Sequence, residues 1–218
     1  MDGAVPADWR THLAEVIKQP QLQADRSIFH ELNPQIAQAP ILKGLDRPVR
    51  KAAVLIPILD RPIGPQILLT VRPKTMPTHA GEISFPGGGH QPEDDGMVGT
   101  ALRETHEEVG VPAEAVSVLG SMGVHNGGRG FAVTPILGIV DGAVPIVPCE
   151  REVEEVFEVP LDFLTNTDNH LIETRNTLGT DYRMPAVPYD DGERRWHIWG
   201  LTAAILHSLA LAYTNGGS

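Results

Sequence analysis

The sequence predicts an α/β or α+β protein in which helices cover a β-sheet. Two observations carry this prediction. Short runs rich in Val and Ile alternate with turns that contain Gly and Pro, which is typical of strands. Apolar residues instead recur at helical spacing over residues 97–109, and an apolar segment without turn residues covers 201–213.

The N-terminal part of the chain is expected to lie outside the main domain. A helix is expected over residues 7–18, because apolar residues recur there at helical spacing. The stretch 33–49 contains several prolines and no hydrophobic period, which predicts a linker or a wrapping arm. The expected parts are an N-terminal helix with an extended arm, one main domain and a flexible tail, over residues 1–49, 50–213 and 214–218.

The first strands are expected directly after this arm. Residues 52–59 form a continuous apolar run, which predicts a buried strand. A turn with Pro and Gly at 61–65 separates this run from a second one at 66–72, so the pair is expected to form a β-hairpin. A short strand at 82–85 follows, and we expect residues 86–89, Pro-Gly-Gly-Gly, to form the turn that closes it.

The clearest helix is expected over residues 97–109. Its apolar positions follow the i, i+3, i+4, i+7 pattern and predict one buried stripe. Gly110 stands where helices commonly end in a left-handed residue. The expected stripe comprises Val98, Ala101, Leu102, Thr105 and Val109.

The C-terminal half is expected to alternate strands and turns before a last helix. The strands are expected at 116–122, 132–140, 153–158 and 197–199, and the helix at 201–213.

Composition limits the classes of partner. The formal net charge is −11, which disfavours non-specific nucleic-acid binding, because nucleic-acid binders usually have a basic surface. We find no stretch long enough to cross a bilayer and no signal peptide in MDGAVPADWR. The single cysteine, Cys149, excludes an internal disulfide and agrees with a reducing compartment. We expect a cytoplasmic protein with a small-molecule partner and neither nucleic acid nor membrane, and a homodimer stays open.

Three glutamates of the expected helix form the main chemical feature. On a helical projection Glu104, Glu107 and Glu108 fall within an arc of about 100°, beside the buried stripe. Hard divalent cations prefer carboxylate oxygens, and a cation would relieve the repulsion among the three groups. A solvated acidic face is the alternative, because charge-rich helices are common. The glycines at 87–89 favour a site, since they let the backbone approach a ligand closely.

Residues 89–111, GHQPEDDGMVGTALRETHEEVGV, resemble the signature of the Nudix hydrolases. That signature runs from a glycine through an acid to an Arg-Glu pair and then a Glu-Glu pair on one helix. Asp95 stands where the family usually has Glu, and Thr105 stands where it prefers an aliphatic residue. The matching positions are Gly89, Arg103, Glu104, Glu107, Glu108, Gly110 and Val111.

Residues 68–89, LLTVRPKTMPTHAGEISFPGGG, are similar to a further signature of Nudix enzymes that resemble coenzyme A pyrophosphatases. Pro77 replaces the second arginine of that pattern, and Gln91 stands where an aspartate often follows the glycines. Residues 152–161 and 198–203 also look like this subfamily. The matching positions are Leu68, Leu69, Thr70, Arg72, His79, Gly81, Phe85, Pro86, Gly87 and Gly88.

The resemblance implies a Nudix-like α/β/α sandwich with a mixed β-sheet and metal-dependent hydrolysis of a diphosphate bond. It implies Mg²⁺ or Mn²⁺ as the ion. The planar guanidinium of Arg103 is expected to orient the glutamates. The implied metal ligands are Glu104, Glu107, Glu108 and a carbonyl at Gly88.

The general base and the substrate contacts stay open at this stage. The base is Glu107 or Glu108 acting through a metal-bound water, or an acid of residues 150–155, among which we favour Glu152. A structural hydrogen bond is the alternative for His79, and the Gly-rich loop that contains His125 is a further candidate. The residues expected to bind substrate are Arg72, His79, Gly87 and Gly89.

Coenzyme A or an acyl derivative is the substrate that the resemblance favours. Its hydrolysis would give a phosphopantetheine and adenosine 3′,5′-bisphosphate. Another nucleoside diphosphate derivative, such as ADP-ribose or a dinucleotide, is the alternative substrate. A Nudix domain that binds a nucleotide as a sensor, without catalysis, is the alternative from another functional class.

Overall fold

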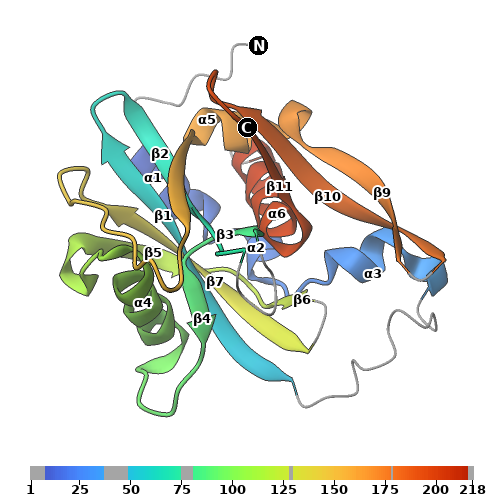
Figure 1. Ribbon diagram of the computed structural model, residues 1–218, viewed down its shortest axis with the longest axis horizontal. Helices are drawn as coiled ribbons and strands as arrows, with labels where there is room; N and C mark the ends of the chain where they lie inside the picture. Colours follow the sequence, from blue (N-terminus) through green and yellow to red (C-terminus); the bar gives the residue numbers. More distant parts are fainter. Residues whose placement is uncertain (1–7, 37–48, 75–80, 128–129, 178, 216–218) are drawn as a thin grey trace.

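The computed structural model describes residues 8–36, 49–74, 81–127, 130–177 and 179–215. Within these ranges, helices cover both faces of a large mixed β-sheet, and a small antiparallel sheet packs to one side (Figure 1). The large sheet contains β1 (Arg50–Arg61), β2 (Gly64–Val71), β3 (Ile83–Ser84), β4 (Gly87–Gly89), β5 (Val116–Ser121), β6 (His125–Gly127), β7 (Phe131–Val140) and β8 (Glu155–Pro160). The small sheet contains β9 (Leu171–Thr177), β10 (Thr180–Asp190) and β11 (Arg195–Trp199).

The helical elements are short except for α4 and α6. They are α1 (Trp9–Val16), α2 (Pro20–Gln23), α3 (Ile28–Leu32), η1 (Pro34–Ile36), α4 (Gly96–Val109), η3 (Ala113–Ala115), α5 (Leu161–Thr165), η4 (Thr167–Asn169) and α6 (Gly200–Asn215). The expected strands and helices are thus present with bounds shifted by a few residues. Among the described residues, no helix combines the length and the hydrophobicity needed to span a bilayer.

Strand β1 lies at the centre of the large sheet. It runs parallel to β7 and antiparallel to β2, which makes the sheet mixed. Its side chains alternate between two apolar clusters: Ile56 and Ile58 contribute to the cluster that contains α6, whereas Leu55 shares a cluster with Ala101 of α4. Figure 1 shows α4 and α6 on opposite sides of the sheet. The predicted α/β/α sandwich with a mixed sheet is confirmed.

The N-terminal helices cover α6. Most side chains of α6 are buried, so a second layer must cover the helix on the side away from the sheet. Trp9, Leu13 and Leu22 belong to the same apolar cluster as Leu206 of α6. Residues 9–22 therefore pack on the sandwich, and residues 37–48 of the expected arm lie outside the described residues.

The expected turn at 86–89 is wrong. Gly87–Gly89 form strand β4, which pairs with β1 so that Gly87 lies opposite Val54. A Cβ atom on Gly87 would lie 2.4 Å from the carbonyl oxygen of Ala53. The glycines therefore serve close approach between neighbouring strands rather than a reversal of the chain.

The expected stripe of α4 is wrong in part. Val98 is 37% exposed, and Leu102 is only half-buried. The helix instead turns its small residues Ala101 and Thr105 toward the sheet, together with Glu108. Small side chains bring the helix axis close to β1, which carries a glutamate into the interior.

Candidate active site

The C-terminal end of α4 anchors the loop that precedes β8. The helix ends at Gly110, whose φ of 73° is left-handed, as expected. The N–H groups of Val147 and Cys149 donate to the carbonyl oxygens of Val109 and Glu108, each at 2.9 Å. This docking brings the loop residue Glu152 to the same side of the sheet as the helix.

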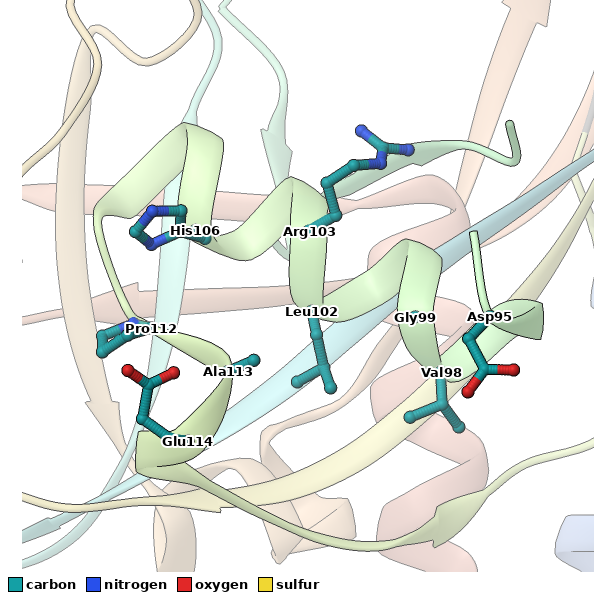
Figure 2. Close-up of a pocket in the computed structure, with 9 residues that line it drawn as sticks. All are labelled: Asp95, Val98, Gly99, Leu102, Arg103, His106, Pro112, Ala113 and Glu114. Carbon is teal, nitrogen blue, oxygen red and sulfur yellow. The ribbon is translucent and has the colours of Figure 1, made fainter. Parts of the chain in front are cut away.

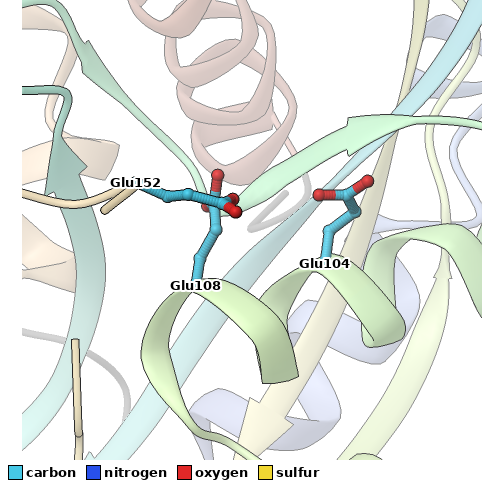
Figure 3. Close-up of side chains that lie close together, drawn as sticks. All are labelled: Glu104, Glu108 and Glu152. Atoms are coloured by element: carbon cyan, nitrogen blue, oxygen red, sulfur yellow. The ribbon is translucent and has the colours of Figure 1, made fainter. Parts of the chain in front are cut away.

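Three carboxylates converge at this place (Figure 3). Glu104 and Glu108 lie one turn apart on α4, and Glu152 reaches them from the loop. One carboxylate oxygen of each lies within 4.8 Å of the others. The helical spacing explains the first pair, and the backbone bonds to the helix end explain the third member.

Burial makes this cluster electrostatically costly. Glu108 is 4% exposed, and burial raises its pKa to about 7, a rise that Glu104 and Glu152 reinforce. The Gly87 N–H and the Arg72 guanidinium oppose that rise. Burial also raises the pKa of Glu104, while Arg103 opposes it. Oxygen donors that repel one another and are partly withdrawn from water fit a divalent cation, so the donor set agrees with the metal that the sequence implies.

The backbone of strand β4 contacts the glutamates and Arg103. The N–H of Gly87 donates to Glu108 Oε2 at 3.1 Å, and the carbonyl oxygen of Gly89 accepts from Arg103 Nη2 at 3.1 Å. A Cβ atom on Gly88 would lie 2.4 Å from the carboxyl carbon of Glu104. Only glycine lets the Glu104 carboxylate lie against this strand. Substrate binding by Gly87 and Gly89 stays a prediction.

Arg103 connects the helix to strand β4. Its Nη1 donates to Glu104 Oε1 at 2.9 Å and to Glu107 Oε2 at 3.0 Å. The side chain of Glu107 is half exposed and lies outside the cluster of three carboxylates. Arg103 therefore contacts both glutamates. Its orienting role and the role of Glu107 as a metal ligand stay predictions.

Asp94 is a site residue that the sequence did not single out. Its carboxylate accepts from Arg103 Nε at 2.7 Å and Nη2 at 3.0 Å, and from the Thr100 hydroxyl at 2.8 Å. The hydrogen bond from Arg103 holds the pKa of Asp94 far below its usual range. Asp95, which occupies the signature position, is exposed, and among the described residues it forms no hydrogen bond or ion pair with Arg103. The acid that holds the arginine is therefore one position earlier than the signature places it.

Arg72 lies at the end of β2, beside the cluster. Its N–H donates to the carbonyl oxygen of Glu82, and its carbonyl oxygen accepts from Gly81, each at 3.0 Å. Its Nε is buried and has no hydrogen-bond partner in the part of the chain that the structure describes. The positive charge of Arg72 acts on the cluster, because it opposes the rise in the pKa of Glu108. His79, the other residue expected here, lies outside the described residues.

His125 does not join the site. It is 1% exposed, and its ring nitrogens lie 3.0 Å from the carbonyl oxygen of Gly123 and 3.2 Å from the Ser208 hydroxyl of α6. The expectation that it faces substrate is therefore wrong, because the ring packs into the interior on α6.

A separate cavity of about 570 Å³ lies on the outer surface of α4, between this helix and η3 (Figure 2). Val98 and Leu102 line it together with Pro112 of the following loop. Arg103 lines it too, but none of the three clustered glutamates does. The cavity is therefore distinct from the carboxylate cluster.

Comparisons with known proteins agree with this geometry. The NUDIX domain family matches residues 49–177. The protein named "Uncharacterized Nudix hydrolase NudL" from Yersinia pestis (strain Pestoides F) is 41% identical over 162 residues, which cover 74% of this chain and 78% of that protein. The protein of the same name from Yersinia pseudotuberculosis serotype O:1b (strain IP 31758) gives the same values.

Solved structures of the family are more distant. A Nudix hydrolase from M. Smegmatis, RenU, matches with 23% identity and a TM-score of 0.44, covering 56% of this chain and 76% of that one. The family match and the relatives at 41% identity decide the assignment. The chain belongs to the Nudix hydrolases and is a pyrophosphohydrolase that acts on a nucleoside diphosphate derivative.

Proposed function

We propose that Glu104, Glu108 and Glu152 hold Mg²⁺ or Mn²⁺, and that this site hydrolyses the diphosphate bond of coenzyme A or an acyl derivative. The products are a phosphopantetheine and adenosine 3′,5′-bisphosphate. The observation that carries the metal proposal is the convergence of three carboxylates within 4.8 Å. The resemblance to the family signature adds Glu107 and the carbonyl of Gly88 to the proposed ligands.

The chain's own residues supply distinct parts of the reaction. A bound divalent cation would neutralise the diphosphate and activate water. Glu152 is the most exposed of the three glutamates and belongs to a loop. The carboxylate oxygen that it does not offer to the cation is therefore the proposed acceptor for the proton of the attacking water. Arg103 fixes Glu104 against the glycine strand and keeps that carboxylate in place while charge develops.

The position and charge of Arg72 support the proposal of an anionic substrate. A chain with net charge −11 repels a polyanion unless cations act locally. The Arg72 guanidinium lies close enough to Glu108 to oppose the rise of that residue's pKa, and its buried Nε has no partner among the described residues. We propose that Arg72 binds a phosphate oxygen of the substrate. Matched variants Arg72→Lys and Arg72→Gln test the contact, because the loss of the guanidinium contact is expected to raise KM more than it lowers kcat.

The choice of coenzyme A rests on the resemblance of residues 68–89. In the structure this segment supplies Leu68 and Leu69 to the core and the glycines to β4. Its loop, residues 75–80, which carries Pro77 and His79, lies outside the described residues. We also propose the cytoplasm as the compartment, since the lone Cys149 suits a reducing environment.

A panel of substrates tests the choice of coenzyme A separately from the catalytic assignment of the cluster. Coenzyme A, its form that lacks the 3′-phosphate, ADP-ribose and a dinucleotide are incubated with Mg²⁺ or Mn²⁺, and the products are identified by mass. We expect kcat/KM for coenzyme A to exceed that for the dephosphorylated form by about tenfold or more, as recognition of a 3′-phosphate requires. Equal values would show that coenzyme A is the wrong substrate. Turnover of none of the four would contradict the catalytic assignment of the cluster.

A further inference from the structure

Strand β9 forms an open edge of the small sheet. Figure 1 shows it as the outermost strand, and it pairs only with β10 among the described residues. The pairing runs without a register shift from Leu171 to Thr177, and the strand contains no Pro or Lys. By contrast β5, which ends the strand order of the large sheet, carries a register shift between Val118 and Gly120. An edge without a bulge, a proline or a lysine is a template for a further strand.

The direction of the free backbone groups of β9 follows from Asn33. This buried side chain accepts from the N–H of Arg183 at 2.6 Å and donates to its carbonyl oxygen at 2.8 Å. The polar groups of Arg183 therefore point away from β9. Thr174, which lies opposite Arg183, belongs to a non-hydrogen-bonded pair, so its own N–H and C=O point to the open edge. The same holds by alternation for Ile172 and Asn176.

The side chains of β9 are complementary to a second copy of the same strand. Glu173 and Arg175 lie on one face, where Arg175 Nη2 is 3.4 Å from Glu173 Oε2. When two β9 strands pair antiparallel about Thr174, Glu173 of each copy lies opposite Arg175 of the other. These are non-hydrogen-bonded positions, at which cross-strand side chains are closest. The exposed Leu171 and Ile172, at 47% and 38%, would be partly covered near the ends of the pair.

We propose that β9 is a homodimer interface, in which the β9 strands of two copies pair antiparallel about Thr174. The two small sheets then join into one continuous sheet. The outward N–H and C=O groups of Ile172, Thr174 and Asn176 make the new ladder. The occupant is a second copy because the charge pattern of the strand matches its own reverse.

Charge reversal tests this pairing on the full-length protein. Sedimentation equilibrium is measured over about 1–200 μM, a range suited to an interface of modest area. We expect Glu173→Arg or Arg175→Glu to raise the dimer dissociation constant about tenfold or more, because like charges then face each other twice. The double variant Glu173→Arg/Arg175→Glu restores the opposite pairs and should return the constant to within about threefold of wild type.

Two further variants complete the design. Thr174→Pro removes an outward N–H, and proline is tolerated at such an edge position, so this variant should be monomeric with a melting temperature close to wild type. Glu114→Arg changes an exposed charge at the cavity on α4 and should leave the dissociation constant unchanged. A wild type that is monomeric throughout would overturn the proposal. So would a dimer that survives Thr174→Pro, or one that Glu114→Arg disrupts while Glu173→Arg does not.

Discussion

Glu108 shows at the residue scale how the site is made at the expense of stability. Its carboxylate is buried between the glycine strand and two other glutamates, and its only direct hydrogen bond from the described residues comes from the Gly87 N–H. Burial of a carboxylate without a full set of donors is unfavourable, which is why its pKa rises to about 7. Such an arrangement persists where a ligand compensates it.

Replacement of Glu108 by Gln separates function from folding. We expect Glu108→Gln to lower kcat by about a thousandfold or more, because a metal ligand is lost, and to leave the melting temperature equal or slightly higher, because the buried charge is gone. Steady-state kinetics and thermal melts without metal measure the two effects. Glu107→Gln, also expected to lower kcat strongly, tests the ligand outside the cluster. Glu93→Gln, in the exposed loop before α4, is the control and should match wild type. Activity that persists in Glu108→Gln would show that the metal assignment is wrong.

The adjacent acids Asp94 and Asp95 make a second matched pair of variants. Asp94 accepts two hydrogen bonds from Arg103, whereas Asp95 is exposed. We expect Asp94→Asn to lower kcat about 10- to 100-fold with little change in KM, since it loosens the arginine that orients Glu104. Asp95→Asn should leave kcat unchanged within about twofold. Steady-state kinetics of both variants measure these effects. A larger loss of kcat in Asp95→Asn than in Asp94→Asn would show that the acid at the signature position, Asp95, supports Arg103.

The C-terminal end of α4 governs the site at the scale of elements. Gly110 has a φ of 73°, and a Cβ atom there would lie 3.2 Å from Val147 of the docked loop. We expect Gly110→Ala to destabilise the protein by about 1–2 kcal/mol, because L residues rarely adopt this conformation. Urea denaturation measures the loss. Gly99→Ala, within the same helix, should cost less than Gly110→Ala, because its backbone is helical and the nearest atom to an added Cβ is the Cβ of Asp95 at 3.3 Å.

The Gly110→Ala variant also tests what positions Glu152. The loop that carries Glu152 bonds to the helix end through Val147 and Cys149. If Gly110→Ala displaces this loop, kcat falls together with stability, whereas an unchanged kcat would show that Glu152 is positioned independently of the helix end.

Sequence periodicity predicted the elements whose environment is uniform along their length. The strand β1 is buried on both faces and is therefore a continuous apolar run, and α6 is apolar along most of its length. The hairpin of β9 and β10 was missed, because many of its residues are polar and only partly buried or exposed, and it shows no apolar period. Gly87–Gly89 were expected to turn, because glycine marks turns locally and its use for close strand approach depends on β1.

The residues of the site also differ in how far the sequence could predict their positions. Glu104, Glu108 and Arg103 were predictable, since the geometry of one helix fixes their relative positions. Glu152 was favoured among several acids, but its place in the cluster depends on a loop docked through tertiary contacts. The choice of Asp94 over Asp95 depends on the backbone of the loop before α4, which two adjacent acids leave undetermined.

At the scale of the whole molecule, α6 joins the N-terminal helices to the rest of the sandwich. Its His207 lies 3.3 Å from His170, Nδ1 to Nδ1, and its Ser208 contacts both His125 and Arg26. Burial lowers the pKa of each of the three histidines. The α6 layer therefore contains imidazoles that resist protonation in the folded state.

Stability is accordingly expected to fall as the pH falls through the usual histidine range. An unfolded histidine binds a proton below a pH of about 6.5, whereas these folded ones bind it only at lower pH. Between the two values the unfolded state holds more protons, so acid favours unfolding. The effect is absent above the unfolded pKa and grows below it. Arg26, which lowers the pKa of both His125 and His207, adds to it.

Urea denaturation at pH 7.5 and pH 5.5 measures this dependence. The metal-free Glu108→Gln variant is the suitable background, because the carboxyl of Glu108 otherwise takes up a proton in the same window with the opposite effect on stability. We expect the urea concentration at the midpoint of unfolding to be lower at pH 5.5 than at pH 7.5. This difference should be smaller when His170→Asn and His207→Asn are added. His30→Asn, on the exposed side of α3, is the matched control and should leave the slope unchanged. The prediction that the histidines of the α6 layer destabilise the fold in acid would be contradicted by either of two results. One is a urea midpoint that does not fall with pH, and the other is a pH dependence that the His170 and His207 variants leave unchanged.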